Sequence, residues 1–402
     1  MKILVMKFGG TSVADIKKIK NVASIIKDKS KKYKIVAVLS AMAGATNNLQ
    51  KNIDAISKTR SPDSDLVITS AEQVSVGLLS MILNKDNIKC MSMLGWQVPI
   101  ITDNSYGKSK ILNIDTKILK KNFKKFNVIV IAGFQGISLE GKISSLGRGG
   151  SDTSAVAIAA ALKAERCDIF TDVAGVYTTD PNIYYRAKKI NKISYEEMLE
   201  MASMGAKVLQ SRSVELAMKN NLQLQVLSSF TKKTGTMIIN EDKLIEKEIV
   251  SGVSYSKNES KITISGVPDK PGISAKIFGV LSDNNINVDM IVQNISQDGV
   301  KANLTFTVQS NDVDSAMSIL KKNSSLINYQ TLSNDNNVAK ISVIGVGMIS
   351  QTGVAKKMFE TLAKNKINIL AISTSEIKIS VLINKRFIKE AVKSLHKVYN
   401  LN

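Results

Sequence analysis

The chain has 402 residues, a net charge of +21 and 44% hydrophobic residues, a composition typical of a globular protein with two or three domains. Its apolar runs fall short of the roughly 20 residues that span a bilayer, and Lys7 interrupts the first of them, so we expect neither a membrane helix nor a signal peptide. Two cysteines, Cys90 and Cys167, exclude a disulfide framework. We therefore expect a cytoplasmic protein.

The positive charge raises the alternative of a nucleic-acid or membrane partner. The basic residues are spread through all regions of the chain, and nearly all of them are lysine. Nucleic-acid readers use more arginine, for its bidentate guanidinium. A solvated lysine-rich surface explains the charge better, and we expect no nucleic acid and no membrane as partners.

Residues 1–240 alternate apolar β-type runs with helical patterns. Continuous apolar strands between helices are typical of a mostly parallel sheet covered on both faces, with the chemistry carried by loops at the strand ends. The predicted strands are Ile3–Met6, Ile35–Leu39, Val128–Ala132, Ile169–Thr171 and Leu224–Leu227, and the predicted helices are Ile16–Lys27, Leu66–Leu83, Ser151–Lys163, Tyr195–Ala202 and Ala206–Lys219.

Two glycine-rich segments lie in this part of the chain. Residues 7–12 (KFGGTS) follow the first predicted strand, and residues 147–154 (GRGGSDTS) open a predicted helix. Glycine lets backbone N–H groups close on an anion, and a helix start adds its positive end. Each segment also carries a cation, Lys7 or Arg148. The pair indicates two anionic groups brought together, as in phosphoryl transfer, without the usual P-loop pattern.

An internal repeat follows a polar boundary at residues 231–247. Residues 261–267 (KITISGV) recur as 340–346 (KISVIGV), and residues 272–278 (GISAKIF) recur as 353–359 (GVAKKMF). Each copy reads strand, glycine turn, helix, two strands and helix, which is the split βαβ pattern. We expect the segment Ile249–Tyr255 to pair with the second copy, so that the first copy is inserted in it. Such a pair suggests a regulatory module, a dimer interface or both.

The motifs along the whole chain resemble those of the aspartokinases, which have the amino-acid-kinase fold. The matching segments are residues 7–13 (KFGGTSV), 38–47 (VLSAMAGATN), 70–73 (SAEQ), 133–136 (GFQG), 146–154 (LGRGGSDTS), 171–181 (TDVAGVYTTDP), 194–200 (SYEEMLE) and 205–209 (GAKVL), and the repeats resemble the paired ACT domains of that family.

The resemblance implies an α/β fold: an amino-acid-kinase-type three-layer sandwich with a mostly parallel sheet, followed by two ferredoxin-like α+β ACT domains. We place the catalytic domain at residues 1–240, a linker and joining strand at 241–260, and the ACT domains at 261–330 and 338–402. This length leaves no room for the homoserine dehydrogenase domain of bifunctional relatives.

The activity implied by the resemblance is phosphorylation of the L-aspartate β-carboxylate by ATP with Mg²⁺, giving 4-phospho-L-aspartate, the first step toward lysine, threonine and methionine. A carboxylate is already a nucleophile, so catalysis would consist of positioning and cationic stabilisation. His396 is the only histidine, and neither cysteine lies in a motif, which argues against His- or Cys-based nucleophilic catalysis.

The resemblance also assigns roles in the catalytic half. Lys7 would neutralise the transition state and Asp152 would orient it, while Arg148 would bind the aspartate α-carboxylate and Glu72 its α-ammonium group. From the residues alone, Asp152 is equally a first-turn helix acid, and Glu72 an exposed helix glutamate. The substrate pocket would be completed by Ser40, Thr46 and Ser151, whose simpler interpretation is loop capping.

The nucleotide would be bound by Lys7, Gly9, Gly10, Thr171, Asp172, Tyr177, Asn182 and Lys207. Asn182 departs from the family pattern, which often has arginine after Thr-Asp-Pro, so nucleotide affinity is in doubt. The segment after Lys207 also departs, reading Val-Leu-Gln-Ser-Arg where many members have His-Pro-Arg. We take that as tolerated variation.

In the repeats, the resemblance implies feedback inhibition by threonine, lysine or both at the interface of a homodimer, or of a larger assembly with an ACT-only subunit. The implied effector-site residues are Asp269, Gly272, Ser274, Gln293, Asn294, Thr374, Ser375 and Glu376. Several of them are equally ordinary turn residues, because Asp-Lys-Pro-Gly is itself a turn signal.

Three other functions remain as alternatives: a kinase of the same fold acting on glutamate, carbamate or a nucleotide monophosphate; a catalytically silent amino-acid sensor; and a nucleic-acid-binding protein. The ACT pair and the Ser-Ala-Glu-Gln segment disfavour the first, and the presence of Lys7, Glu72, Arg148 and Asp152 disfavours the second.

Overall fold

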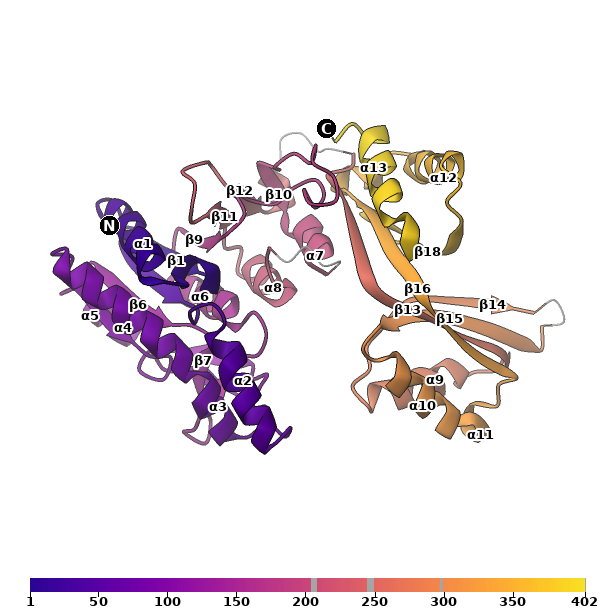
Figure 1. The fold of residues 1–402 in the computed structure, drawn as a ribbon, viewed down its shortest axis with the longest axis horizontal. Helices are drawn as coiled ribbons and strands as arrows, with labels where there is room; N and C mark the ends of the chain where they lie inside the picture. The colour runs from indigo at the N-terminus through magenta and orange to yellow at the C-terminus, as the bar shows by residue number, and fades with distance from the viewer. Residues whose placement is uncertain (204–207, 244–248, 297–298, 402) are drawn as a thin grey trace. The chain divides into compact units, whose positions relative to one another are not determined.

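The structure is a computed structural model and describes residues 1–203, 208–243, 249–296 and 299–401. It divides into two compact units (Figure 1). The first unit contains residues 1–176 and 189–245, and the second contains residues 177–188 and 246–402.

An eight-stranded sheet forms the centre of the first unit, in the order β10-β12-β11-β9-β1-β2-β6-β3. Six of its neighbouring pairs are parallel and only β11–β12 is antiparallel, which confirms the predicted mostly parallel sheet. The strands are β1 (Ile3–Phe8), β2 (Lys34–Leu39), β3 (Cys90–Met93), β6 (Val128–Ala132), β9 (Arg166–Thr171), β10 (Lys192–Ser194), β11 (Leu224–Ser228) and β12 (Thr236–Ile239).

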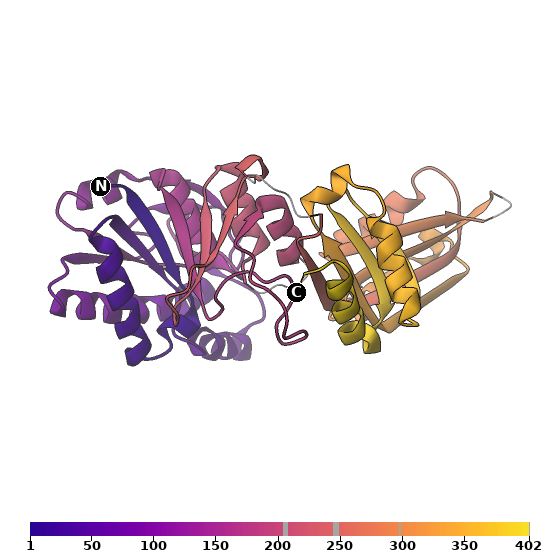
Figure 2. The ribbon, with the colours of Figure 1, turned by 90° about the horizontal axis from the view of Figure 1, so that it is seen from above.

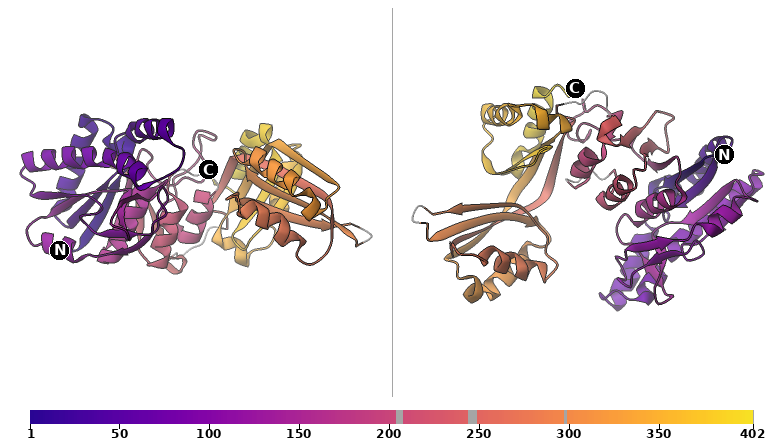
Figure 3. Two further views of the ribbon diagram at one scale, coloured as in Figure 1. Left: turned by 90° about the horizontal axis from the view of Figure 1, so that it is seen from below. Right: turned by 180° about the vertical axis from the view of Figure 1, so that it is seen from behind.

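Helices lie on both sides of these strands (Figures 2 and 3). On one side, Leu4, Met6 and Phe8 of β1 pack with apolar side chains of α1 and α4 in one core. On the other, α6 contacts β1, β2, β9 and α8, and its residues from Gly150 to Ala159 are all buried. The helices are α1 (Ile16–Ser30), α2 (Ala45–Ile56), α3 (Pro62–Ile68), α4 (Ser70–Lys85), α5 (Lys117–Asn122), α6 (Gly150–Leu162), α7 (Tyr195–Ser203) and α8 (Ser211–Lys219).

A second, four-stranded sheet has the order β5-β4-β7-β8 and was not predicted. Its strands are β4 (Ile100–Thr102), β5 (Ile111–Ile114), β7 (Gln135–Ser138) and β8 (Ile143–Ser145). They are only three or four residues long and carry buried polar side chains such as Thr102 and Ser144, which share a hydrogen bond of 2.6 Å. Such short, partly polar segments do not give the apolar alternation by which strands are recognised.

The prediction of one helix over 66–83 is wrong, because α3 ends at Ile68 and α4 begins at Ser70. The hydroxyl of Thr69, between them, donates to the carbonyl of Asp65 at 2.8 Å. The combined stretch Pro62–Lys85 is long and apolar enough to cross a membrane by composition alone, contrary to our expectation. Half of its apolar window is buried within the protein, as in a core helix.

The second unit is built on a six-stranded sheet in the order β14-β15-β13-β16-β18-β17. Its two long antiparallel strands, β13 and β16, run through both repeats, and the helices gather at their two ends (Figures 1 and 3). The strands are β13 (Gly252–Pro268), β14 (Val288–Ile295), β15 (Lys301–Gln309), β16 (Thr331–Ile344), β17 (Ile369–Thr374) and β18 (Lys378–Asn384), and the helices are α9 (Ile273–Ser282), α10 (Val313–Lys322), α11 (Ser324–Ile327), α12 (Val354–Lys364) and α13 (Ile388–Val398).

Each repeat has a core of its own. One core draws on residues 262–327 and the other on residues 339–401 together with Val250 and Val253. The start of β13 supplies this last pair and is hydrogen-bonded to the end of β16, with Gly252 opposite Ile344. The expected insertion of one copy into the other is therefore confirmed.

A partly buried ion cluster joins the two repeats. Lys340 of β16 forms ion pairs with Glu259 of β13, at 3.4 Å, and with Asp289 of β14. Lys340 and Glu259 are buried. Because removing one member of a buried pair leaves an uncompensated charge, this cluster constrains how the strands of the two copies align.

Residues 177–188 belong to the second unit, outside the boundary predicted near residue 240. The Thr178 hydroxyl lies 2.7 Å from Nε2 of the buried His396, and the Tyr184 ring contacts the His396 ring edge-on. The hydroxyl of Tyr255 in β13 donates to Asp180 at 3.0 Å. These polar contacts over a long sequence separation tie the segment to the C-terminal repeat.

Candidate active site

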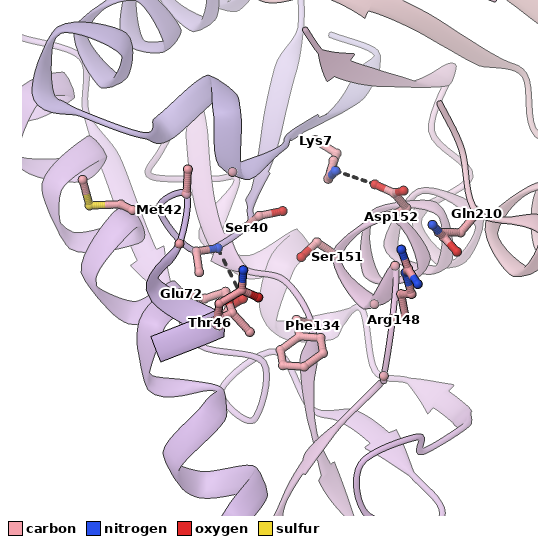
Figure 4. A pocket seen from close by; sticks show the side chains of 18 residues that line it. Lys7, Ser40, Met42, Thr46, Glu72, Phe134, Arg148, Ser151, Asp152 and Gln210 are labelled. Carbon is pink, nitrogen blue, oxygen red and sulfur yellow. Dashed lines mark hydrogen bonds and ion pairs between the residues drawn. The ribbon is translucent and has the colours of Figure 1, made fainter. Parts of the chain in front are cut away.

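A cavity of about 360 Å³ in the first unit brings together eight of the residues predicted for the site. The cavity lies where β1, β2 and β6 end, which is the edge at which parallel sheets bind ligands. Its predicted members are Lys7, Gly10, Ser40, Thr46, Glu72, Arg148, Ser151 and Asp152. Figure 4 shows Glu72 and Thr46 on one side of it and Lys7, Asp152 and Arg148 on the other.

Lys7 and Asp152 form an ion pair with 2.5 Å between Nζ and Oδ1. Lys7 is the second-last residue of β1, and Asp152 lies in the first turn of α6. Both side chains are largely buried, with 12% and 10% of their surfaces exposed. The pair therefore holds an ammonium group at the cavity wall, where screening by water is weak. A lysine held in this way can stabilise negative charge that develops on a phosphoryl group.

The glycines beside Lys7 permit close backbone approach. A Cβ on Gly10 would lie 2.9 Å from the carbonyl oxygen of Ala41, and a Cβ on Gly9 would lie 3.4 Å from Nζ of Lys7. Contacts this short leave no room for a side chain at Gly10. The loop after β1 therefore packs directly on the loop after β2, which carries Ser40.

Glu72, in the first turn of α4, is a buried carboxyl group with one oxygen unused. Its Oε1 accepts a hydrogen bond from the N–H of Ala41 at 3.3 Å, while Oε2 has no hydrogen-bond partner among the described residues. Burial raises the pKa of Glu72 to about 8, because desolvation disfavours the carboxylate. A bound cation would reverse this shift, so the side chain is suited to an ammonium group.

Arg148 lies in the four-residue loop between β8 and α6. Its neighbours Gly147 and Gly149 have φ angles of +73° and +71°, a conformation that favours glycine. A Cβ on Gly149 would also lie 2.0 Å from Cγ of Gln210. Within the described residues, the Arg148 guanidinium has no hydrogen-bond or ion-pair partner, and it is available to a ligand carboxylate.

Three hydroxyl side chains complete the predicted substrate set. Ser40 follows β2, and its N–H donates to the carbonyl of Phe8 at 3.1 Å. Thr46 is the second residue of α2, and Ser151 is the second residue of α6. Each lines the cavity near a helix start or strand end, so all three can donate to an anionic ligand.

Sequence reasoning missed Phe134 and Gln210, which also line the cavity. Phe134 has a φ of +67°, unusual for a bulky residue. Its N–H donates to Ser154 at 3.0 Å and its carbonyl accepts from Leu146 at 2.9 Å. Phe134 lies within a quoted motif and Gln210 at a departure from the family pattern, but neither signal shows that the side chain faces a ligand.

Of the residues predicted for the nucleotide, Lys7 and Gly10 line this cavity, whereas Gly9, Thr171, Asp172, Tyr177 and Asn182 do not. Thr171 ends β9, and its hydroxyl donates to the exposed Asp172 at 3.1 Å. Tyr177 and Asn182 belong to the second unit, where the amide of Asn182 donates to Asp180 at 3.1 Å. Lys207 lies outside the described residues.

The residues predicted for an effector lie in turns, in the first turn of α9 and on or next to the two edge strands of the second unit. In the first repeat, Gly272 precedes α9 with a φ of +90°, and Gly353 precedes α12 with a φ of +89° at the equivalent place in the second. The Ser274 hydroxyl donates to Gln293 of β14 at 3.3 Å. Asp269 lies in the turn before α9 and Asn294 in β14, while Thr374 ends β17 and Ser375 and Glu376 follow it.

Comparisons with known proteins agree with this architecture. Residues 2–228 match the amino acid kinase family, and residues 262–323 and 341–399 match the ACT domain. An aspartate kinase of Pseudomonas fluorescens is 48% identical over all of this chain and 98% of its own length.

Two solved structures of Escherichia coli aspartokinase III are also similar. The complex with aspartate and ADP, in the R-state, has a TM-score of 0.81 at 27% identity and covers 99% of both chains. The complex with lysine and aspartate, in the T-state, has a TM-score of 0.77 at 26% identity over 100% of both. With its kinase-type first unit and its paired ACT repeats, the chain belongs to the aspartate kinases.

Proposed function

We propose that this enzyme transfers the γ-phosphoryl group of ATP to the β-carboxylate of L-aspartate, giving 4-phospho-L-aspartate, as the first step toward lysine, threonine and methionine. The observation that carries the proposal is a carboxyl oxygen of Glu72 that, like Arg148, has no partner in the described part of the chain, in a cavity that also holds the Lys7–Asp152 pair. An amino acid with a second carboxylate matches these groups, and it is an aspartate that was bound in the similar structures.

Each charged group then has one task. Glu72 binds the α-ammonium group and Arg148 the α-carboxylate, and together they orient the β-carboxylate. Lys7, oriented by Asp152, neutralises charge as the phosphoryl group passes to the acceptor oxygen. No general base is required, because the nucleophile is already ionised, so positioning and electrostatic stabilisation supply the rate. Ser40, Thr46 and Ser151 complete the acceptor pocket.

ATP would be bound by Gly9, Gly10, Thr171, Asp172, Tyr177, Asn182 and Lys207 as well as Lys7. Among the described residues, no group of three His, Cys, Asp or Glu side chains could hold a metal. Mg²⁺ would accordingly arrive with the nucleotide, bound mainly by phosphate oxygens and water, and would neutralise phosphate charge. We also propose a cytoplasmic location, in keeping with two free cysteines.

The direct test is ATP- and Mg²⁺-dependent acyl-phosphate formation, trapped as the hydroxamate. We expect product with L-aspartate and little with L-glutamate. The Lys7→Met variant should lower kcat by roughly 100- to 1,000-fold, as loss of one transition-state donor does. Wild-type enzyme that is folded but forms no aspartyl hydroxamate would refute the proposal and favour an amino-acid sensor.

A second variant separates catalysis from folding in that test. Lys7→Met alone leaves the buried Asp152 uncompensated and should lower the melting temperature. Adding Asp152→Asn removes the stranded charge, so the double variant should regain thermal stability without regaining activity. Recovery of activity in the double variant would show that Lys7 is not a catalytic group.

The raised pKa of Glu72 predicts a pH dependence of aspartate binding. Below pH 8, binding an ammonium group requires Glu72 to release a proton, so the KM for aspartate should fall up to tenfold per unit as the pH rises toward 8, then level. The KM for ATP should not follow this pH dependence.

The Glu72→Gln variant should raise the KM for aspartate about 100-fold, equal to about 3 kcal/mol. It should also flatten the pH dependence of that KM, because glutamine does not titrate. An unchanged pH dependence in the variant would contradict the assignment.

We further propose that the ACT repeats bind threonine or lysine and shift the enzyme toward an inactive population. The T-state relative carries lysine, and Asp269, Gly272, Ser274, Gln293, Asn294, Thr374, Ser375 and Glu376 supply polar groups beside edge strands. Here Gln293→Ala should raise the effector concentration for half-inhibition at least tenfold relative to that of the wild type. Gln309→Ala, on the neighbouring strand, is the control, and equal shifts in both would contradict the site.

The same edge strands support a homodimer through the second unit. Ile291 and Ile295 of β14 and Leu370 and Ile372 of β17 are exposed apolar side chains, and unpaired strand edges favour association. Sedimentation should show a dimer for the wild type and a monomer after Ile291→Lys with Ile372→Lys. A monomeric wild type would exclude this assembly.

A further inference from the structure

Two oppositely charged side chains hold the segments on which the Arg148 loop rests, and the proposed function gives neither of them a role. One is Asp65 of α3, and the other is Arg212 of α8. Asp65 contacts Ser145 at the end of β8, Arg212 contacts the next residue, Leu146, and both contact the neighbouring segment at residues 107–109.

Asp65 gathers three donors around one buried carboxylate. It accepts hydrogen bonds from the N–H groups of Gly107, at 3.0 Å, and Ser145, at 2.6 Å, and from the Ser145 hydroxyl at 2.8 Å. Its side chain is 1% exposed, and no cation pairs with it in the described part of the chain. A buried anion satisfied only by neutral donors fixes their positions closely, because each lost bond leaves charge unsolvated.

Arg212 makes the complementary contacts from α8. Its two terminal nitrogens donate to the carbonyl oxygens of Leu146 and Ser109, each at 2.9 Å. No carboxylate lies within ion-pair distance of Arg212 among the described residues, and its planar guanidinium group donates to backbone carbonyls. The Ser109 N–H also donates to the Ser145 carbonyl at 2.9 Å, which ties the two segments directly together.

The Arg148 loop is short, and its position depends on the segments that Asp65 and Arg212 hold. Four residues, Leu146 to Gly149, separate β8 from α6, and the two glycines on either side of Arg148 allow many backbone conformations. The Leu146 carbonyl held by Arg212 lies two residues before Arg148. A shift at Leu146 therefore moves the guanidinium in the cavity, whereas the Lys7–Asp152 pair is anchored separately in β1 and α6.

We infer that Arg212 and Asp65 are positioning residues that hold the Arg148 loop for the acceptor's α-carboxylate. This inference rests on the proposed function, in which Arg148 binds that carboxylate. It predicts an effect on acceptor binding rather than on nucleotide binding, because the hydrogen bonds of Asp65 and Arg212 go to the segments beside the Arg148 loop and to none of the proposed nucleotide residues.

The test is a double-mutant cycle on kcat/KM for aspartate. Arg212→Lys keeps the charge but cannot bridge two carbonyls, and we expect about a tenfold loss, mainly in the KM for aspartate, with the KM for ATP within twofold of wild type. Arg148→Lys alone should lose more, about 100-fold. If Arg212 acts through Arg148, the double variant should match Arg148→Lys within threefold; additive losses, or an equal change in the KM for ATP, would overturn the inference.

Hydrogen exchange provides a readout that does not depend on activity. In the ligand-free full-length protein, amides of residues 146–150 should exchange at least fivefold faster in Arg212→Lys than in wild type. The matched control is Arg166→Lys, the same change at a half-buried arginine that pairs with Asp168. Arg166 is the first residue of β9, so it lies at the end of the strand away from the cavity. Unchanged exchange in Arg212→Lys, or an equal increase in the control, would overturn the inference.

The two readouts separate failure of the inference from failure of the proposed function. Absence of aspartyl hydroxamate in the wild type refutes the proposed function, while the exchange measurement still decides whether Arg212 holds the loop. Should Arg212→Lys not fold, the Asp65→Asn variant replaces the other charged group that holds these segments. It should give the same increase in exchange and the same loss of affinity for aspartate. No change in either readout would overturn the inference.

Discussion

The catalytic unit depends on one ion pair, Lys7–Asp152, which joins the central strand of the sheet to the helix that covers it. β1 lies between β2 and β9 in parallel register, so the backbone of Lys7 is fixed on both sides. The first residues of α6 are buried, so Asp152 is fixed too. An ammonium group held in this way needs little reorganisation when negative charge develops beside it, which is the requirement for electrostatic catalysis.

The two units are connected by the polypeptide chain itself. The chain passes between the units three times, at residues 176–177, 188–189 and 245–246. The segment between the first two crossings carries Tyr177 and Asn182, two of the proposed nucleotide residues, and is tied by Thr178 to His396 at the C-terminal helix. The Thr178–His396 contact therefore links the position of this segment to that of the C-terminal helix.

The sequence was sufficient to predict those elements that are encoded by a short-range pattern of apolar residues. Val128–Ala132 is a strand with the predicted bounds because five consecutive apolar residues are buried on both faces. Lys7 and Arg148 were singled out by the glycine-rich segments that carry them, and Glu72 by its resemblance to a family motif. The break at Thr69 between α3 and α4 was missed, because the apolar pattern continues through it. Phe134 was also missed as a cavity residue, because its left-handed backbone is held by contacts with Leu146 and Ser154.

The charged side chains that line the cavity discriminate among possible phosphoryl acceptors. Neither Glu72 nor Arg148 has an ion-pair partner among the described residues, and burial raises the pKa of Glu72 because its negative charge is costly while unpaired. A carbamate or a nucleotide monophosphate brings only negative charge, so it would leave Glu72 uncompensated and would favour its protonated form. In the proposed function, a zwitterionic α-amino acid would satisfy both groups at once, and a carboxylate on its side chain would then be the one free to meet the phosphoryl group beside Lys7. Glu72, buried and without an ion-pair partner among the described residues, lowers the stability of the free protein at neutral pH, because folding then requires the carboxyl group to bind a proton, and it favours a ligand that carries an ammonium group.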